Sequence, residues 1–145
     1  MVLKSIVLLY LKINEIMKFV SKEDKELLLK DICQRLPYGV KVKTDNIHIL
    51  RLGTHTRVGE YVTNVIEPCK PYLFPLSSMT EEQKREYNSL RNLVPTYHYE
   101  FGDIVEDTEL YDNFESIDYL IANHFDFRGL IPMGLAIDAT GLNIY

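Results

Sequence analysis

The chain has 145 residues, of which 46% are hydrophobic and 26% are charged. These fractions match average globular domains and exclude intrinsic disorder and fibrous repeats. The length suits one ordinary domain, whose core needs no disulfide or metal ion. The net charge of −5 is uneven, because residues 1–59 carry a net +5 and residues 60–145 a net −10. Such polarity is typical of a basic binding face, or of a domain whose two ends attract each other or are simply solvated.

An apolar run from Ile6 to Leu11 lies near the amino terminus. It is too short to cross a bilayer, which needs about 20 apolar residues. Polar residues follow it where a signal peptide would have a small-residue cleavage site. We therefore expect no membrane span and a cytoplasmic location.

The first strong helix signal is Ser21, which can cap a helix with an acid three residues later. This signal favours Met17 as the start of the domain. We therefore expect residues 1–16 to be an N-terminal extension and residues 17–145 to be a single α+β domain. The alternative is that residues 4–13 form a genuine first strand or helix.

Periodicity and capping signals predict three helices. In the first, apolar residues recur at intervals of three and four up to Leu36, and Pro37 stops the helix. The second begins at Thr80, which opens a capping box, and the third at Asn113. We expect these helices over residues 21–36, 80–93 and 113–125.

Three β-rich runs follow the first helix. Residues 40–43 and 47–52 are separated by the turn-forming pair Asp45-Asn46, which predicts a hairpin. Residues 60–66 form the third run. The sequence therefore predicts an α+β fold with a small antiparallel sheet of about three strands packed with about three helices.

Two segments are expected to be irregular, and a third to be extended. Residues 67–78 contain three prolines, which predict a connector rather than a paired strand. Residues 92–127 hold nine Asp or Glu and no Lys or Arg, so we expect an acidic surface with a loop before the third helix. The apolar tail, residues 130–137, predicts a buried extended segment or a last edge strand.

The acids of the loop expected before the third helix do not have the spacing of a calcium-binding loop. We expect a solvated surface there, with no metal ion and no cofactor. The five acids are Asp103, Glu106, Asp107, Glu109 and Asp112.

The most site-like cluster is His124, Asp126 and Arg128. These three residues could supply a base, a carboxylate that orients it and a guanidinium that binds an anion. Neighbouring residues of a helix point in different directions, however. The alternative is that Asp126 and Arg128 pair with each other or cap the helix end, and we expect both to serve folding.

A set of basic residues on and near the predicted hairpin, named at the end of this paragraph, could contact phosphates. It lacks a helix-turn-helix, a zinc finger or an RNA-binding aromatic motif, so a solvent-facing hairpin is the simpler interpretation. The chain also lacks G-x-S-x-G, P-loop, GxGxxG and HExxH motifs. The basic set consists of Lys41, Lys43, Arg51 and Arg57 with His48 and His55.

Three blocks of sequence carry a resemblance to a known family. They are Leu27 to Val40 (LLLKDICQRLPYGV), Lys70 to Glu82 (KPYLFPLSSMTEE) and His124 to Ile131 (HFDFRGLI). Together they resemble a family of small uncharacterised proteins from gut Bacteroides-type bacteria and their phages or mobile elements. The resemblance implies a bacterial or phage origin and fits Met17 as the start. It implies no activity, ligand or site residue.

The sequence thus leads to three hypotheses on function. The first is an accessory protein of a phage or mobile element that binds another macromolecule, with a protein as the expected partner, without catalysis. The second is a small-molecule binder or enzyme that uses the acidic region and the segment from His124 to Arg128. The third is nucleic-acid binding through the basic hairpin, which the acidic overall charge disfavours. The oligomeric state is left open.

Overall fold

The computed structural model describes residues 3–9, 21–43, 49–53 and 70–145, of which residues 3–9 form an exposed helical segment. Helices and mixed sheets together confirm the α+β class. The expected strand over residues 60–66 and the Asp45-Asn46 turn lie outside the described residues. The elements are α2 (Lys22–Arg35), η1 (Leu36–Tyr38), β1 (Lys41–Lys43), β2 (Ile49–Arg51), β3 (Lys70–Pro75), η2 (Leu76–Ser78), α4 (Glu81–Leu90), β4 (Asn92–Glu100), β5 (Asp103–Tyr111), α5 (Phe114–Ala122), β6 (Phe125–Asp126) and β7 (Ile137–Asp138).

The main sheet has the strand order β2-β1-β3-β6, and β7 also pairs with β3. The β1–β2 pair is antiparallel with Lys41 opposite Arg51, so the pairing of these two runs is confirmed. β3 runs antiparallel to β1 but parallel to β6 and β7. The sheet is therefore larger than expected and of mixed direction.

The expected connector over residues 67–78 is wrong for its central part, because Lys70–Pro75 forms β3. Its two prolines, Pro71 and Pro75, stand near the ends of the strand, where a missing N–H is tolerated. The middle of β3 keeps its donors and acceptors. Phe74 N–H donates to His124 O (2.9 Å), and Leu73 O accepts from Ala139 N–H (2.8 Å).

α2 covers the β1–β2 part of the sheet. Ser21 caps it by accepting a hydrogen bond from Asp24 N–H at 3.1 Å, as its sequence predicts. Leu28 and Ile32 lie one turn apart on its inner face and are fully buried. The cluster that they join is completed by Val40, Val42 and Leu52.

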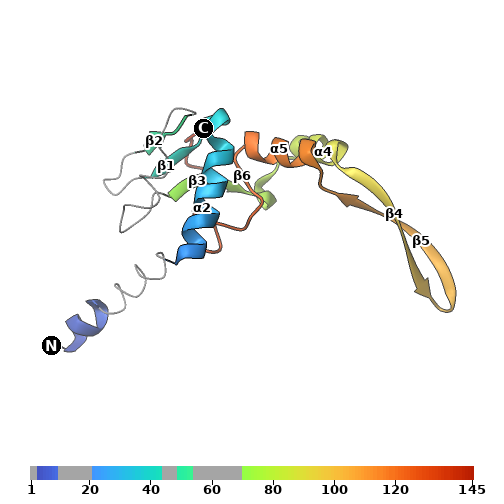
Figure 1. Cartoon of the computed structure of the whole chain (residues 1–145), viewed down its shortest axis with the longest axis horizontal. Helices are drawn as coiled ribbons and strands as arrows, with labels where there is room; N and C mark the ends of the chain where they lie inside the picture. The colour runs from blue at the N-terminus through green and yellow to red at the C-terminus, as the bar shows by residue number, and fades with distance from the viewer. Residues whose placement is uncertain (1–2, 10–20, 44–48, 54–69) are drawn as a thin grey trace.

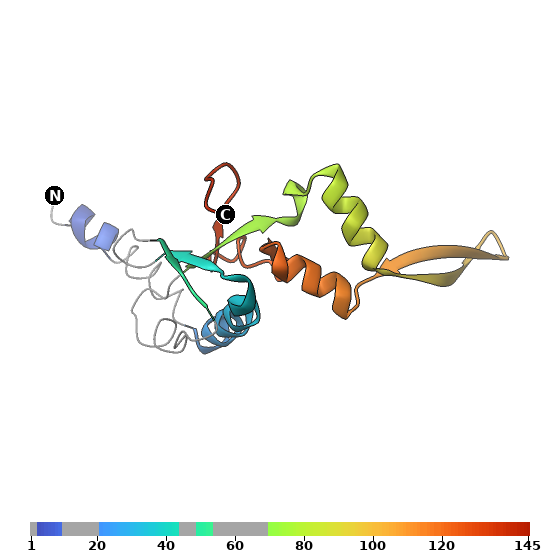
Figure 2. The ribbon, with the colours of Figure 1, turned by 90° about the horizontal axis from the view of Figure 1, so that it is seen from above.

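α4 and α5 lie side by side next to the sheet (Figure 2). Both begin with capping boxes, at Thr80 and Asn113, which confirms the two predicted starts. α4 ends at Leu90 rather than at residue 93, because the next residues pair as a strand. α5 ends at Ala122 rather than at residue 125, because His124 has a φ of 61° and turns the chain out of the helix.

The apolar tail returns to the core. Leu130, Leu135 and Ala136 are buried against Leu73 of β3. The expectation of an extended segment over residues 130–137 is wrong for residues 130–136, which form turns. Only Ile137–Asp138 forms a short last strand, β7, beside β3.

The expected acidic loop is wrong for residues 92–111. These residues form β4 and β5, a two-stranded antiparallel hairpin that projects away from the rest of the protein (Figures 1 and 2). We call this hairpin the arm. Among the helices that the structure describes, none combines the length and the apolar character needed to cross a bilayer.

Candidate functional site

The arm is fixed to α4 and α5 by polar contacts at its base. Arg91 Nη2 donates to Leu110 O at 2.7 Å, and Arg91 Nε lies 3.3 Å from the Asp112 carboxylate. Asn113 Nδ2 donates to Leu90 O at 2.6 Å. The two helices therefore set the direction in which the arm projects.

The tip of the arm is a two-residue turn made of Phe101 and Gly102. Both residues have positive φ, 51° and 87°, as a type I′ turn requires. Glycine adopts this conformation freely, but a phenylalanine there is strained by about 1–2 kcal/mol. The Phe101 side chain is also 99% exposed. A bulky apolar side chain that is both strained and uncovered indicates a role outside the fold.

The two faces of the arm differ in chemistry. Successive residues of a strand point to opposite faces, and directly opposed residues share a face. One face, here the apolar face, holds Leu93, Pro95, Tyr97 and Tyr99 of β4 with Ile104 and Leu110 of β5, and its polar members are Glu106 and Thr108. The other, here the acidic face, holds Glu100, Asp103, Asp107 and Glu109, together with Asn92, Val94, Thr96, His98, Val105 and Tyr111.

The apolar face is not covered. Tyr99 is 80% exposed, Tyr97 and Ile104 are each 65% exposed, and Leu93 is 64% exposed. A two-stranded hairpin by itself has marginal stability in water, because it has no second layer to bury its apolar side chains. Contiguous exposed apolar surface is uncommon on soluble proteins, so this face is the candidate site.

The outer edges of the arm are interrupted at one cross-strand pair, Pro95 and Thr108. Cross-strand pairs of an antiparallel hairpin alternate between hydrogen-bonded and non-hydrogen-bonded pairs. The pair that closes the turn, Glu100 and Asp103, is of the hydrogen-bonded kind. Counted from there, Pro95 and Thr108 form a non-hydrogen-bonded pair, so their backbone N atoms point away from the partner strand. Pro95 has no N–H, and the Thr108 N–H donates to the Asp107 carboxylate at 2.8 Å. Addition of a further strand is thus hindered at both edges.

The five acids predicted as a solvated surface are distributed along the arm and its base. Four of them belong to β5, where Glu106 lies on the apolar face and Asp103, Asp107 and Glu109 on the acidic face. The fifth, Asp112, holds Arg91 at the base. Within the described ranges, no group of three or more His, Cys, Asp or Glu is arranged to hold a metal ion.

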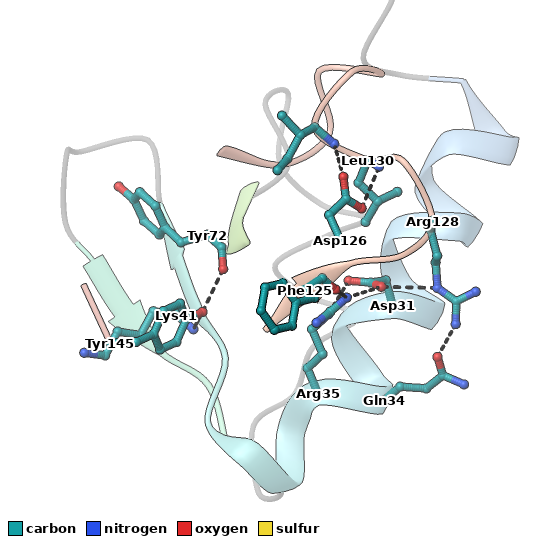
Figure 3. Close-up of polar contacts among 11 residues, drawn as sticks. Asp31, Gln34, Arg35, Lys41, Tyr72, Phe125, Asp126, Arg128, Leu130 and Tyr145 are labelled. Atoms are coloured by element: carbon teal, nitrogen blue, oxygen red, sulfur yellow. Dashed lines mark hydrogen bonds and ion pairs between the residues drawn. The ribbon is translucent and has the colours of Figure 1, made fainter. Parts of the chain in front are cut away.

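His124, Asp126 and Arg128 do not converge. Figure 3 shows Asp126 beside Leu130 and Arg128 beside Asp31 and Gln34, and the His124 ring stacks on Tyr145. Asp126 is buried and accepts hydrogen bonds from Leu130 N–H and Ile131 N–H, both at 2.8 Å. It therefore holds the turn that starts the tail, rather than pairing with Arg128. Through these two hydrogen bonds Asp126 supports the fold.

Arg128 instead joins a buried ion-pair network on α2. Its Nε donates to Asp31 at 3.2 Å, and its guanidinium also contacts Gln34. Asp31 pairs with Arg35 through two bonds, of 2.8 and 3.1 Å, and Arg35 Nη2 donates to Phe125 O at 2.7 Å. Asp31 and Arg35 are both fully buried, so this network joins α2 to β6 across 90 residues of sequence.

His124 lies in a pocket of about 400 Å³ beside the C-terminus. Its ring stacks on Tyr145 with 3.7 Å between centroids, and Phe74 lies 5.9 Å from the same tyrosine. Burial, and then the positive charges of Arg35, Lys41 and Arg51, lower the pKa of His124 to about 4, so its ring is uncharged at neutral pH. The residues that line the pocket include none of the acids of the arm.

Of the basic set, Lys41, Lys43 and Arg51 lie on the β1–β2 pair. Lys41 is engaged with the C-terminal segment. Its backbone N–H donates to the Tyr145 hydroxyl at 2.9 Å, and the two residues lie together in Figure 3. Its ammonium contacts Ile144 O and lies 5.6 Å from the Tyr145 ring centroid. Arg57, His48 and His55 lie outside the described residues.

Comparisons of the chain with protein-family models, with curated proteins and with solved structures find no match.

Sequence reasoning missed the arm, although a signal for it was present. Non-polar residues alternate with polar ones from Pro95 to Tyr99, and β-branched residues resume at Ile104 after Gly102. The usual Asn-Gly or Asp-Gly turn is absent, and the acidic composition of the segment favoured a loop.

Proposed function

We propose that this protein acts without catalysis, by binding another protein through the apolar face and tip of the arm. The observation that carries the proposal is the uncovered apolar face on a rigidly based hairpin. Phe101 and Tyr99 together present aromatic surface of the kind that is enriched at the centres of protein interfaces. The polar surroundings of this face, with five acids and no Lys or Arg in the arm, favour a partner surface that is apolar with basic residues around it.

The basic hairpin supports nucleic-acid binding less well. The β1–β2 pair carries only three Lys or Arg of the basic set, Lys41, Lys43 and Arg51, and the arm carries five acids that repel phosphates. An origin in a phage or mobile element remains part of the proposal, and rests on the sequence resemblance.

A pair of matched variants tests the proposal. One variant carries Tyr97→Thr, Tyr99→Thr and Ile104→Thr on the apolar face. The control carries Val94→Thr, His98→Thr and Val105→Thr, which lie on the same strands but on the acidic face. Threonine retains the β-propensity of both strands, so the arm is expected to persist in each variant.

Tagged wild-type and variant chains would be used to capture proteins from cells of the source organism, and each captured protein would be identified by mass spectrometry and titrated in purified form. We expect one identified protein to bind the wild type and the control alike. The apolar-face variant should bind it at least about 10-fold more weakly, because it lacks three interface side chains. Equal binding by all three chains, or no protein bound by the wild type, would overturn the proposal.

A further inference from the structure

The tip of the arm has the form of a knob. Phe101 is almost completely exposed, and a carboxylate stands on each side of the turn, at Glu100 and Asp103. The left-handed φ of Phe101 would suit asparagine or glycine better. The phenyl group thus stands at a position where it has no burial to contribute to the fold.

The pocket beside the C-terminus has the form of a matching hole. Its volume of about 400 Å³ lies within the range of natural ligand pockets, so a single phenyl ring fits with room to spare. Four of its ten lining residues are aromatic, namely Phe74, His124, Phe125 and Tyr145. The others are Ser78, Gln83, Ala122, Asn123, Thr140 and Gly141. The His124 ring is uncharged, and aromatic rings prefer to pack against other rings in tilted or offset stacks.

The charges around the knob and the hole are complementary. Lys41 does not line the pocket itself, but its ammonium lies 5.6 Å from the ring centroid of Tyr145, which does, and contacts Ile144 O. Arg51 is directly opposite Lys41 on β2. The turn at the tip carries two carboxylates beside Phe101, and the arm has no Lys or Arg; its one histidine, His98, lies 3.7 Å from the Glu100 carboxylate. Opposite charges around an apolar anchor guide its approach and fix its orientation.

The tip lies at the end of the molecule far from the C-terminus in both views (Figures 1 and 2), so the arm does not reach its own pocket. We propose that Phe101 of one copy inserts into the pocket formed by Phe74, His124 and Tyr145 of a second copy, with Glu100 and Asp103 facing Lys41 and Arg51. This inference rests on the proposed function and names a second copy of the chain as the partner of the arm.

The contact is heterologous, because the arm of one copy meets the pocket of another. A heterologous contact leaves one free arm and one free pocket on every pair, so assembly continues until a ring closes or a filament forms. The wild type is therefore expected to form species larger than a dimer, in amounts that rise with concentration.

Sedimentation of two variants and their mixture tests this directly, at concentrations from about 1 μM to about 1 mM, where small interfaces commonly dissociate. Phe101→Asn removes the knob and suits the left-handed φ. Thr140→Trp narrows the pocket from an exposed position at its lining. Phe114→Asn is the matched control, because Phe114 is equally exposed (96%) but lies at the start of α5.

We expect the wild type and Phe114→Asn to assemble alike. Phe101→Asn and Thr140→Trp should each be monomeric, with association weakened about 30-fold or more, as for other anchor residues. Their mixture should form a 1:1 dimer and nothing larger, because one variant keeps a working pocket and the other a working arm. A wild type that is monomeric at every concentration would overturn the inference, as would assembly by Phe101→Asn.

A photo-reactive benzoylphenylalanine at position 101 gives a second measurement that does not depend on the folding of Thr140→Trp. Cross-links between copies should map to peptides that contain residues 74–83 or 120–145. Cross-links to the arm of the second copy, or only to a different protein, would contradict the inference. In the last case the proposed function would stand with another partner.

Discussion

Replacing Asp31 by asparagine is expected to lower the free energy of unfolding by about 3–5 kcal/mol, the range found when one partner of a buried ion pair is removed. Asp31 is fully buried and is the only carboxylate that contacts Arg35 among the described residues. It also binds Arg128 at 3.2 Å. Asp31→Asn would leave the charge of Arg35 in the core without compensation, at the junction of α2 and β6.

The measurement is urea denaturation at neutral pH. A matched control on the same helix is Glu26→Gln, which removes the exposed Lys22–Glu26 pair (3.8 Å) and should change stability little. If Asp31→Asn unfolds at the same urea concentration as the control, the network does not hold α2 against β6 as described.

The second large effect is expected at Asp126. Asp126→Ala would leave the N–H groups of Leu130 and Ile131 without their charged acceptor, and hydrogen bonds to charged groups contribute about 1.5–3 kcal/mol each. We expect a loss of about 3 kcal/mol in the free energy of unfolding, with the start of the tail disturbed.

Asp138→Ala is the control, because Asp138 makes a similar bond to Thr140 N–H (2.9 Å) at an exposed position. It should cost clearly less than Asp126→Ala. Binding through the arm should be unchanged in any Asp126 variant that remains folded. Loss of binding with stability retained would instead return Asp126 to the list of candidate binding residues.

The helix starts were predictable from the sequence because they are local. Ser21, Thr80 and Asn113 cap helices through bonds to residues only three positions along, and the side-chain chemistry alone identifies them. The pairing of β1 with β2 was predictable for the same reason, since a short connection joins the two runs.

Long-range pairing was not predictable in this way. β3 becomes a central strand only because β1, β6 and β7 come from three distant parts of the chain to pair with it, and its prolines gave a local signal against a strand. The cluster of His124, Asp126 and Arg128 was close in sequence but separates in space, because His124 turns the chain and Arg128 reaches α2.

The arm presented a different difficulty. Its alternation was visible, but sequence patterns are interpreted on the assumption that an apolar face is buried within the same chain. Here the face of Tyr97, Tyr99 and Ile104 is exposed, and no second layer covers it among the described residues. The residues that depart most from the rules of folding are therefore the ones that we assign to function.

The central claim is that the apolar face of the arm is covered by a protein in the cell, and photo-cross-linking from two neighbouring positions tests it most directly. Benzoylphenylalanine would replace Tyr99, on the apolar face, in one chain and His98, on the acidic face, in another. Both positions are exposed and belong to the same strand. Irradiation of intact cells should give a discrete cross-linked protein from position 99 and little or none from position 98. Equal cross-linking from both positions, or none from position 99, would contradict the assignment of the arm as a protein-binding element.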